Sequence, residues 1–178
     1  MKSIALISGF LLCPVAFAYQ GYGVCNYGKE NLQSVVCYGP TMLKESQVTG
    51  DIKVTGPLRA YHVVAGGVSV TGPVLIENSA IHGLVNVIGD FSAVKDDFAS
   101  DLNITSQVVT LNQSTVHGSI TIHASEGEPR LKLQCSTAVA GSVTFSDKPG
   151  VVEVTEDSIV QGKVINGEIA FVKLTCPN

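Results

Sequence analysis

A repeated phrase of nine residues constrains the fold of this chain more than any other feature. Three copies read Ser46-Gln-Val-Thr-Gly-Asp-Ile-Lys-Val54, Ser79-Ala-Ile-His-Gly-Leu-Val-Asn-Val87 and Ser114-Thr-Val-His-Gly-Ser-Ile-Thr-Ile122. Strict alternation places the apolar residues of each copy on one face of a strand, and the central glycine marks a bend of the backbone. The copies centre on the repeat-corner residues Gly50, Gly66, Gly83, Ser100, Gly118, Gly141 and Gly162.

Residues at fixed offsets from these corners form columns of one chemical type. Three columns are apolar and are predicted to face a common core, with Asn166 as the one exception. The residues two before the corner are Val48, Val64, Ile81, Phe98, Val116, Val139 and Val160. The column four before the corner is mostly small and hydroxylated, which predicts hydrogen bonds to corner backbone groups. It contains Ser46, His62, Ser79, Asp96, Ser114, Thr137 and Ser158.

The spacing of the copies decides the fold class. The corners recur at a nearly constant short interval from Gly50 to Gly118 and at somewhat longer intervals from there to Gly162. The interval is too short for a unit of strand and helix, and no helical periodicity is seen within it. A repeat of this size cannot bury its own apolar face, so it must stack on its neighbours. The sequence therefore predicts an all-β, single-domain parallel β-solenoid (β-helix) of about seven coils over residues 42–178.

The start of the chain has the layout of a secretory signal peptide. Met1-Lys2 is positive, residues 4–12 are apolar, and Ala16-Phe17-Ala18 is a small-x-small cleavage site. We therefore expect residues 1–18 to be a signal peptide and residues 19–41, rich in Cys, Gly and Tyr, to form an N-terminal cap. The protein is expected to be exported, to the periplasm or the extracellular space, with no membrane span. Its formal net charge of −4 argues against a nucleic-acid partner.

Four cysteines follow the predicted signal peptide, namely Cys25, Cys37, Cys135 and Cys176. An even number at an oxidising address predicts disulfides, although four cysteines allow three pairings and buried thiols are the alternative. We favour Cys25–Cys37, which would staple the cap, and Cys135–Cys176, which would pin the last strand to an earlier coil. A zinc site is not expected because no close Cys-x-x-Cys pair is present.

The chain carries no catalytic, cofactor-binding or metal-binding signature, so we expect none of these sites. His82 and His117 occupy one outward column, separated by the coil that carries Ala99, so stacking places them roughly 10 Å apart. That gap is too wide for one metal ion. Four carboxylates gather in the fourth copy, where a solvated acidic face is expected in preference to a calcium site. They belong to Asp90, Asp96, Asp97 and Asp101.

Two insertions lengthen the late repeats, at residues 124–129 and 146–150. Insertions that enlarge one corner of a solenoid can carry binding, and they also occur where they disturb the core least. A surface glycan or an envelope partner is the ligand class to consider for these loops. With Arg59 and Arg130 as its only arginines, the chain is a poor candidate for a solenoid lyase that cuts acidic polysaccharides.

The phrase Ser-x-Val-x-Gly-x-Ile-x-Val, repeated at about seventeen residues, resembles the bactofilin-like, polymer-forming β-solenoids of bacteria. The resemblance implies a right-handed solenoid that assembles end to end without nucleotide. We therefore expect a non-enzymatic exported structural or interaction protein, self-assembling through its ends or adhesive. The alternatives are a secreted carbohydrate-binding module and a small polysaccharide-cleaving β-helix enzyme.

Overall fold

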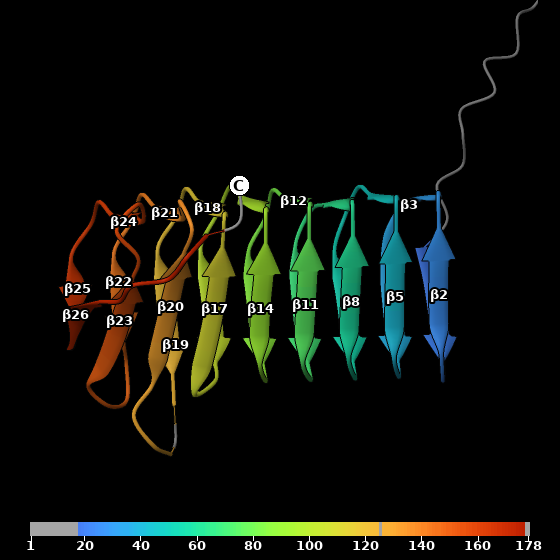
Figure 1. Ribbon diagram of the computed structural model, residues 1–178. Helices are drawn as coiled ribbons and strands as arrows, with labels where there is room; N and C mark the ends of the chain where they lie inside the picture. The colour runs from blue at the N-terminus through green and yellow to red at the C-terminus, as the bar shows by residue number, and fades with distance from the viewer. Residues whose placement is uncertain (1–17, 125, 177–178) are drawn as a thin grey trace, which may run out of the picture.

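The computed structural model describes residues 18–124 and 126–176, and all regular structure in these ranges is β-strand (Figure 1). The predicted signal peptide lies outside the described residues apart from Ala18, which begins the first strand. Within the described residues, twenty-six short strands form three sheets, and every pairing that joins them is parallel. The chain is therefore the parallel β-solenoid that the repeat predicts.

Successive strands pass from sheet A to sheet B to sheet C and then back to sheet A. Sheet A contains β1 (Ala18–Tyr22), β4 (Ser34–Tyr38), β7 (Ile52–Thr55), β10 (Val68–Thr71), β13 (Val85–Ile88), β16 (Leu102–Thr105), β19 (Ile120–His123), β22 (Val143–Phe145) and β25 (Val164–Ile165). Sheet B contains β2 (Cys25–Gly28), β5 (Thr41–Lys44), β8 (Leu58–Tyr61), β11 (Val74–Glu77), β14 (Phe91–Val94), β17 (Val108–Asn112), β20 (Arg130–Gln134), β23 (Gly150–Val154) and β26 (Gly167–Phe171). Sheet C contains β3 (Asn31–Leu32), β6 (Gln47–Val48), β9 (Val64–Ala65), β12 (Ala80–Ile81), β15 (Asp97–Phe98), β18 (Thr115–Val116), β21 (Ala138–Val139) and β24 (Ile159–Val160).

The described residues form nine turns of the solenoid, two more than the number of repeat copies. The difference arises at the N-terminal end, where β1 and β4 precede the first copy of the phrase. The corner before β4 carries Gln33 in place of glycine, so this coil escapes a search for the phrase. The segment 19–41 runs from the second residue of β1 to the first residue of β5, so the end of the rod is made of the same coils as its middle.

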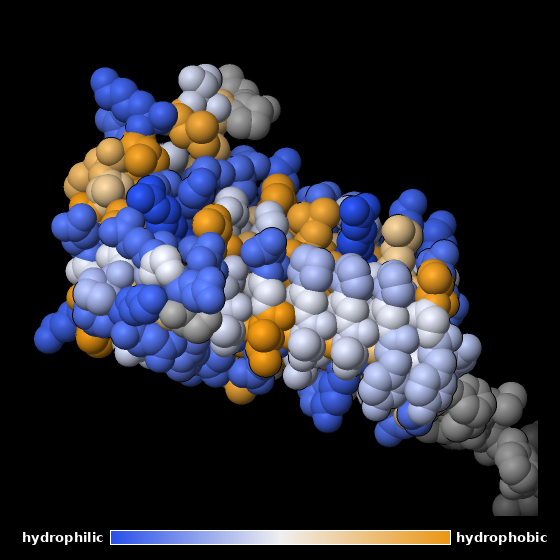
Figure 2. Space-filling view, turned by 90° about the horizontal axis from the view of Figure 1, so that it is seen from below, coloured by the Kyte–Doolittle hydropathy of each residue, from blue (hydrophilic) through white to orange (hydrophobic). Residues whose placement is uncertain are grey.

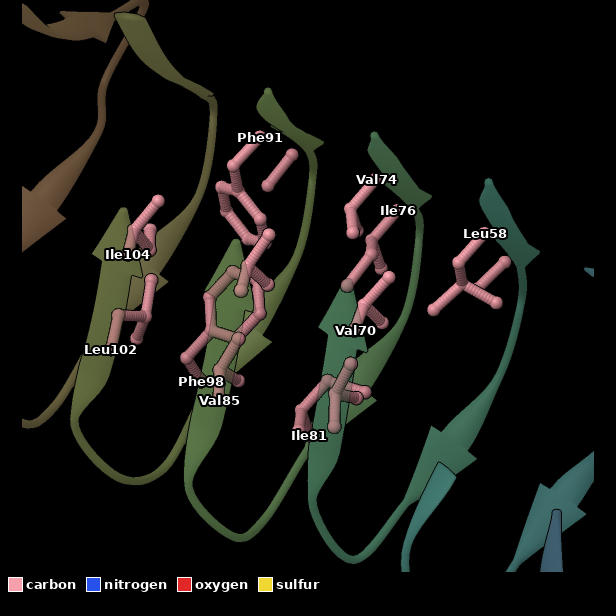
Figure 3. Packing of buried hydrophobic residues seen from close by; sticks show 14 of the residues in the cluster. Leu58, Val70, Val74, Ile76, Ile81, Val85, Phe91, Phe98, Leu102 and Ile104 are labelled. Carbon is pink, nitrogen blue, oxygen red and sulfur yellow. The ribbon is translucent and has the colours of Figure 1, made fainter. Parts of the chain in front are cut away.

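Columns of buried apolar side chains fill the space between the three sheets (Figure 3). The register stacks like on like: Val68 lies between Ile52 and Val85, and Val74 lies between Leu58 and Phe91. The largest fully buried side chains include Phe91, Phe98 and Phe145. The strands of sheet C are very short and contribute only one inward column, so they depend on the core of the other two sheets.

One predicted core residue, Val64, is 40% exposed, and its neighbours Val63 and Ala65 are buried instead. Ala65 pairs with Val48 and with Ile81, so Ala65 and not Val64 continues the inward column of sheet C. The prediction was wrong because this coil is shortened after β9 and not before it. The four-before column shifts with it: Val63 takes the buried place predicted for His62.

Three kinds of corner join the sheets. At the corner from sheet A to sheet B, Gly39-Pro40, Gly56-Pro57 and Gly72-Pro73 stack in register, and these three glycines adopt φ values of 149°, 137° and 142°. At the corner from sheet B to sheet C, the chain turns through exposed residues of positive φ, among them Glu45 and Lys95. Seen from below, the corner from sheet A to sheet B forms a pale band of intermediate hydropathy along the middle coils (Figure 2).

The glycines of the repeat phrase occupy the corner from sheet C to sheet A, where stacked backbones approach closely. None of the six predicted repeat-corner glycines has a positive φ. A Cβ added at Gly66 would lie 2.6 Å from the carbonyl oxygen of Gly50, and one added at Gly83 would lie 2.8 Å from that of Gly66. The stacking distance therefore favours glycine at these positions.

Replacement of Gly83 by Ala is expected to lower the free energy of unfolding by about 1–3 kcal/mol, because a backbone in the adjacent coil must shift to admit the methyl group. Gly28 is the matched control: it lies in β2 with nothing within 4 Å of an added Cβ, so Gly28→Ala should be neutral or slightly stabilising. Urea unfolding followed by circular dichroism measures both. Equal effects of the two substitutions would contradict the stacking argument.

Candidate functional site

Aromatic rings and a disulfide lie at the N-terminal end of the rod. The ring of Tyr19 meets the ring of Tyr27 edge-on, with centroids 5.2 Å apart. Cys25 is bonded to Cys37 in the next coil, with 6.4 Å between the Cα atoms. This is one of the two pairings that we favour from the sequence. Tyr27 is 4% exposed and Tyr19 is 52% exposed, so Tyr19 is the outermost inward-facing side chain at this end.

A buried hydroxyl lies just beneath this end. The Tyr27 hydroxyl oxygen is buried and has no hydrogen-bond partner among the described residues. It lies close to Gly21, since a Cβ built there would be 3.8 Å from it. Burial, together with the proximity of Tyr19 and Glu30, raises the pKa of Tyr27, so the hydroxyl stays protonated and keeps a proton to donate. An unpaired buried donor of this kind is costly and is rare in native structures.

The C-terminal end is open. In β26, Ile169 and Phe171 pair with the inward residues Val152 and Val154 of β23, so both face the core axis. No further coil covers them among the described residues, and they are 47% and 82% exposed. Val160 of β24 and Val164 of β25 are only partly buried at the same end. The rod therefore presents a cross-section of its apolar core to solvent.

The described residues after β26 leave this end uncovered. Residues 172–176, which we call the tail, turn back along the rod (Figure 1). The tail ends at Cys176, which is bonded to Cys135 beyond β20, with 5.5 Å between the Cα atoms. This is the second pairing that we favour from the sequence. The tail thus fastens the last two coils against the side of the solenoid.

Among the described residues, backbone groups at both ends lack strand partners. In a parallel sheet, successive residues bond to opposite neighbours. Gly23 and Cys25 donate to Tyr38 and Pro40 in the next coil, so the N–H groups of alternating residues such as Asn26 point toward the open edge. At the other end, Val172 donates back to Val154, which leaves the N–H of Phe171 directed outward. Proteins normally protect such edges.

A buried polar column follows the corner from sheet B to sheet C. Each member accepts a hydrogen bond from the backbone N–H of the corresponding residue in the preceding coil, at 2.7–3.4 Å. Three of the serine hydroxyls donate in turn to a carbonyl two residues earlier in the chain. The column contains Ser46, Ser79, Asp96, Ser114, Thr137 and Ser158, with Val63 as its apolar interruption. The hydroxyl column therefore has the structural role that its composition predicts.

Asp96 is the one carboxyl group in this column, and it is 4% exposed. Its Oδ1 accepts from the N–H of Ser79 at 2.7 Å and its Oδ2 accepts from the N–H of Val94 at 2.8 Å. Burial raises the pKa of Asp96 to about 7, although the two hydrogen bonds oppose the shift, and Glu77 raises it further. The acidic residues of the fourth copy therefore do not form the uniformly solvated face that we expect from the sequence.

Because the folded-state pKa of Asp96 is raised, its contribution favours folding below about pH 4 and is lost as the pH rises to about 7. Asp96→Ser restores the hydroxyl of the column and removes this loss. We expect the variant to exceed the parent in stability at pH 8, by on the order of 1–3 kcal/mol, and to match it near pH 4. Asp90→Ser, at an exposed carboxylate, is the control. If the free energy of unfolding of Asp96→Ser followed that of the parent at a constant offset across this pH range, the raised pKa of Asp96 would be contradicted.

The histidines and the remaining acidic residues of the fourth copy lie on the surface and form pairs at most. His117 Nε2 is 2.9 Å from Asp97 Oδ1, an exposed pair, and His82 is exposed in the same outward column two coils earlier. Asp101 Oδ1 accepts from the N–H of Ser119 at 2.7 Å. Within residues 18–124 and 126–176, no group of three His, Cys, Asp or Glu side chains is arranged to hold a metal ion.

The late insertions extend the corner from sheet A to sheet B beyond the line of the earlier coils (Figure 1). They are tied to the solenoid by charged contacts: Arg130 donates to Glu128 and to Glu153, each at 2.9 Å. The hydrogen bond to Glu153 and then that to Glu128 make the largest contributions to raising the pKa of Arg130. The N–H of Ala124 donates to Asp147 across the two loops.

Among the described residues, no helix is long and apolar enough to cross a membrane. Comparison of this chain with known protein families, with curated proteins and with solved structures finds no match.

Proposed function

We propose that this chain is an exported, non-catalytic structural protein whose rods associate through their ends into longer solenoids. The observation that carries the proposal is where the exposed apolar side chains lie. Of fourteen large exposed apolar side chains among the described residues, ten belong to the first two coils or to the strands β24 to β26 and the tail. They are Tyr19, Tyr22, Val24, Tyr38, Met42, Ile159, Ile165, Ile169, Phe171 and Leu174. Of these, Tyr19, Ile169 and Phe171 occupy inward positions that a further coil would cover.

Two kinds of interaction would drive the association of rods through their ends. Burial of apolar surface contributes about 25 cal/mol per Å², and both ends offer such surface. Strand edges add hydrogen bonds when a further coil continues the sheets. The sides of the middle coils offer less of both. Their backbone groups are paired within the sheets, and their outward residues are mainly polar, such as Ser69 and Asn103. The exposed apolar exceptions are Val64, Leu84, Ile88 and Val108.

Export is supported by the two disulfides, which persist in oxidising compartments. The resemblance of the repeat to bactofilin-like solenoids, which assemble end to end, also supports self-assembly through the ends. An adhesive role would follow if the assembled rods display the late loops, residues 126–129 and 146–149, at regular intervals.

Light scattering across a concentration series tests the proposal. The chain is produced with its own N-terminus through an oxidising secretory route, and its disulfides are kept intact. We expect the mass to grow with concentration, and electron microscopy of the same samples to show rods longer than one molecule. A constant monomer mass at every concentration would contradict assembly and would direct attention to the lateral loops as a binding site.

A further inference from the structure

The two ends of the rod differ, and the difference selects one way of joining them. We propose that the partner of the C-terminal end is the N-terminal end of a second copy, so that the assembly is polar, head to tail. This inference rests on the proposed function. The strands of the second copy would continue the two larger sheets, with β1 after β25 and β2 after β26. Sheet C has one strand fewer than these two, so its place in the last coil stays open at the junction.

The shape of the last coil supports this junction. The late insertions enlarge the corner from sheet A to sheet B in the two coils that begin with β19 and β22. In the terminal coil that corner is tight again, because β25 ends at Ile165 and β26 begins at Gly167. At the other end of the rod the corner is also short, with β1 ending at Tyr22 and β2 beginning at Cys25. The enlarged corner therefore ends before the terminal coil, and no insertion stands between the two surfaces that would meet.

Parallel stacking also sets which side chains would meet. If the inward columns continue in the register that the chain uses throughout, Ile169 lies over Cys25 and Phe171 lies over Tyr27. Val164 lies over Tyr19, whose ring meets that of Tyr27 edge-on. Every position named in this contact is an inward one, so the junction extends the apolar core from one copy into the next.

A polar pair marks the same junction. Asn166 follows β25 at the place where the preceding coil carries Phe145, and it is the residue that breaks the apolar column of the repeat. Its Nδ2 donates to the carbonyl of Phe145 at 2.9 Å, and the hydrogen bonds of the described residues leave Oδ1 free. In the head-to-tail register Asn166 lies over Gly21, beside the unpaired Tyr27 hydroxyl.

The geometry thus assigns the Tyr27 hydroxyl as donor to Asn166 Oδ1 of the next copy, a contact that requires the ring of Tyr19 beside Gly21 to move aside at the junction. Each end carries one member of the pair, a buried donor at one and a free acceptor at the other. A junction between two C-terminal ends would bring two Asn166 residues together and reverse the strand direction, and it would leave Tyr27 unpaired. The head-to-tail junction satisfies both groups and preserves the parallel direction of sheets A and B.

Variants that block one end each test the polarity. Asn26→Pro removes an N–H that points toward the open N-terminal edge, and Ile169→Asp places a charge in the core of the C-terminal end. Gln20→Pro and Phe171→Asp are second variants for the same ends, and Thr71→Asp on the side of the rod is the control. Sedimentation velocity gives the mass of each variant alone and of the two blocked variants mixed in equal amounts.

We expect each blocked variant to be monomeric alone and the mixture to form dimers only, since one intact end of each kind remains. The control should assemble like the parent chain. Dimers of a single blocked variant would overturn the polar junction while leaving end-to-end association intact. A parent chain that stays monomeric would instead overturn the proposed function.

Tyr27→Phe tests the polar pair. The substitution removes an unpaired hydroxyl from the isolated molecule, so the stability of the monomer should be unchanged or higher. Assembly should weaken by about two- to tenfold, the value of one neutral hydrogen bond. Assembly as strong as that of the parent, measured as the concentration of half-maximal mass growth, would overturn the assignment of Tyr27.

Discussion

Replacement of Phe98 by Ala should destabilise the rod more than any other single truncation of its core, by about 3–5 kcal/mol. Phe98 is fully buried and supplies the inward side chain of the short strand β15. Its ring lies 6.1 Å from that of Phe91, across the core (Figure 3). Truncation leaves a cavity at mid-rod, where each coil depends on both neighbours for its core.

Phe171→Ala is the matched control, because the same substitution removes a ring that is 82% exposed at the open end. The control should change the stability of the monomer by less than about 1 kcal/mol and should weaken assembly instead. Urea unfolding below the concentration at which mass growth begins separates the two effects. Similar losses of monomer stability for the two variants would contradict the location of the core.

Removal of the Cys135–Cys176 disulfide is expected to have the second large effect on stability. The bond closes a loop with a sequence separation of 41, which corresponds to a contribution of about 4 kcal/mol in the chain-entropy account. Cys135→Ala combined with Cys176→Ala releases the tail, so the last coils lose the fastening that holds them to the side of the rod. We expect the loss to be local, beginning in β24 to β26.

Limited proteolysis followed by mass spectrometry measures this fraying: cleavage should appear between residues 156 and 176 in the double variant and not in the parent. Assembly should fall in parallel, because β25 and β26 form the C-terminal end. The matched variant is Cys25→Ala with Cys37→Ala, which should leave residues 156–176 protected. Full protection of the last coils in the Cys135/Cys176 variant would show that the tail is not their fastening.

The repeat phrase was sufficient to predict the fold class because it is a pattern of burial. Residues such as Ile52, Val85 and Ile120 alternate with polar neighbours, and alternation with a constant offset leaves only stacked strands as a solution. The polar column was predictable for the same reason, since a small hydroxyl recurred at one offset. The favoured cysteine pairing followed from the position of Cys25 and Cys37 in one short segment.

Other features depend on geometry that spacing alone does not encode. The shortening around Val64 gives the same repeat length whether the residue is lost before or after β9, so only the register of Ala65 with Ile81 places it. The first coils escaped notice because Gln33 replaces the corner glycine.

The proposed role of Asn166 at the junction could not be predicted for a different reason. In the sequence Asn166 is a polar residue that interrupts an apolar column. Only the structure places it in the terminal coil, where a second copy could contact it. Burial of Asp96 was likewise masked by its exposed neighbours, Asp97 and Asp101, which made the segment read as uniformly acidic.

The direction of the inter-strand repeat in an assembled fibre tests the central claim most directly. Coils stack at about 4.8 Å along the rod axis. If rods join end to end, diffraction from aligned fibres of the oxidised protein should place this inter-strand reflection along the fibre axis, with a fibre as wide as one solenoid. The same reflection perpendicular to the fibre axis would mean that rods associate through their sides, which would contradict the account.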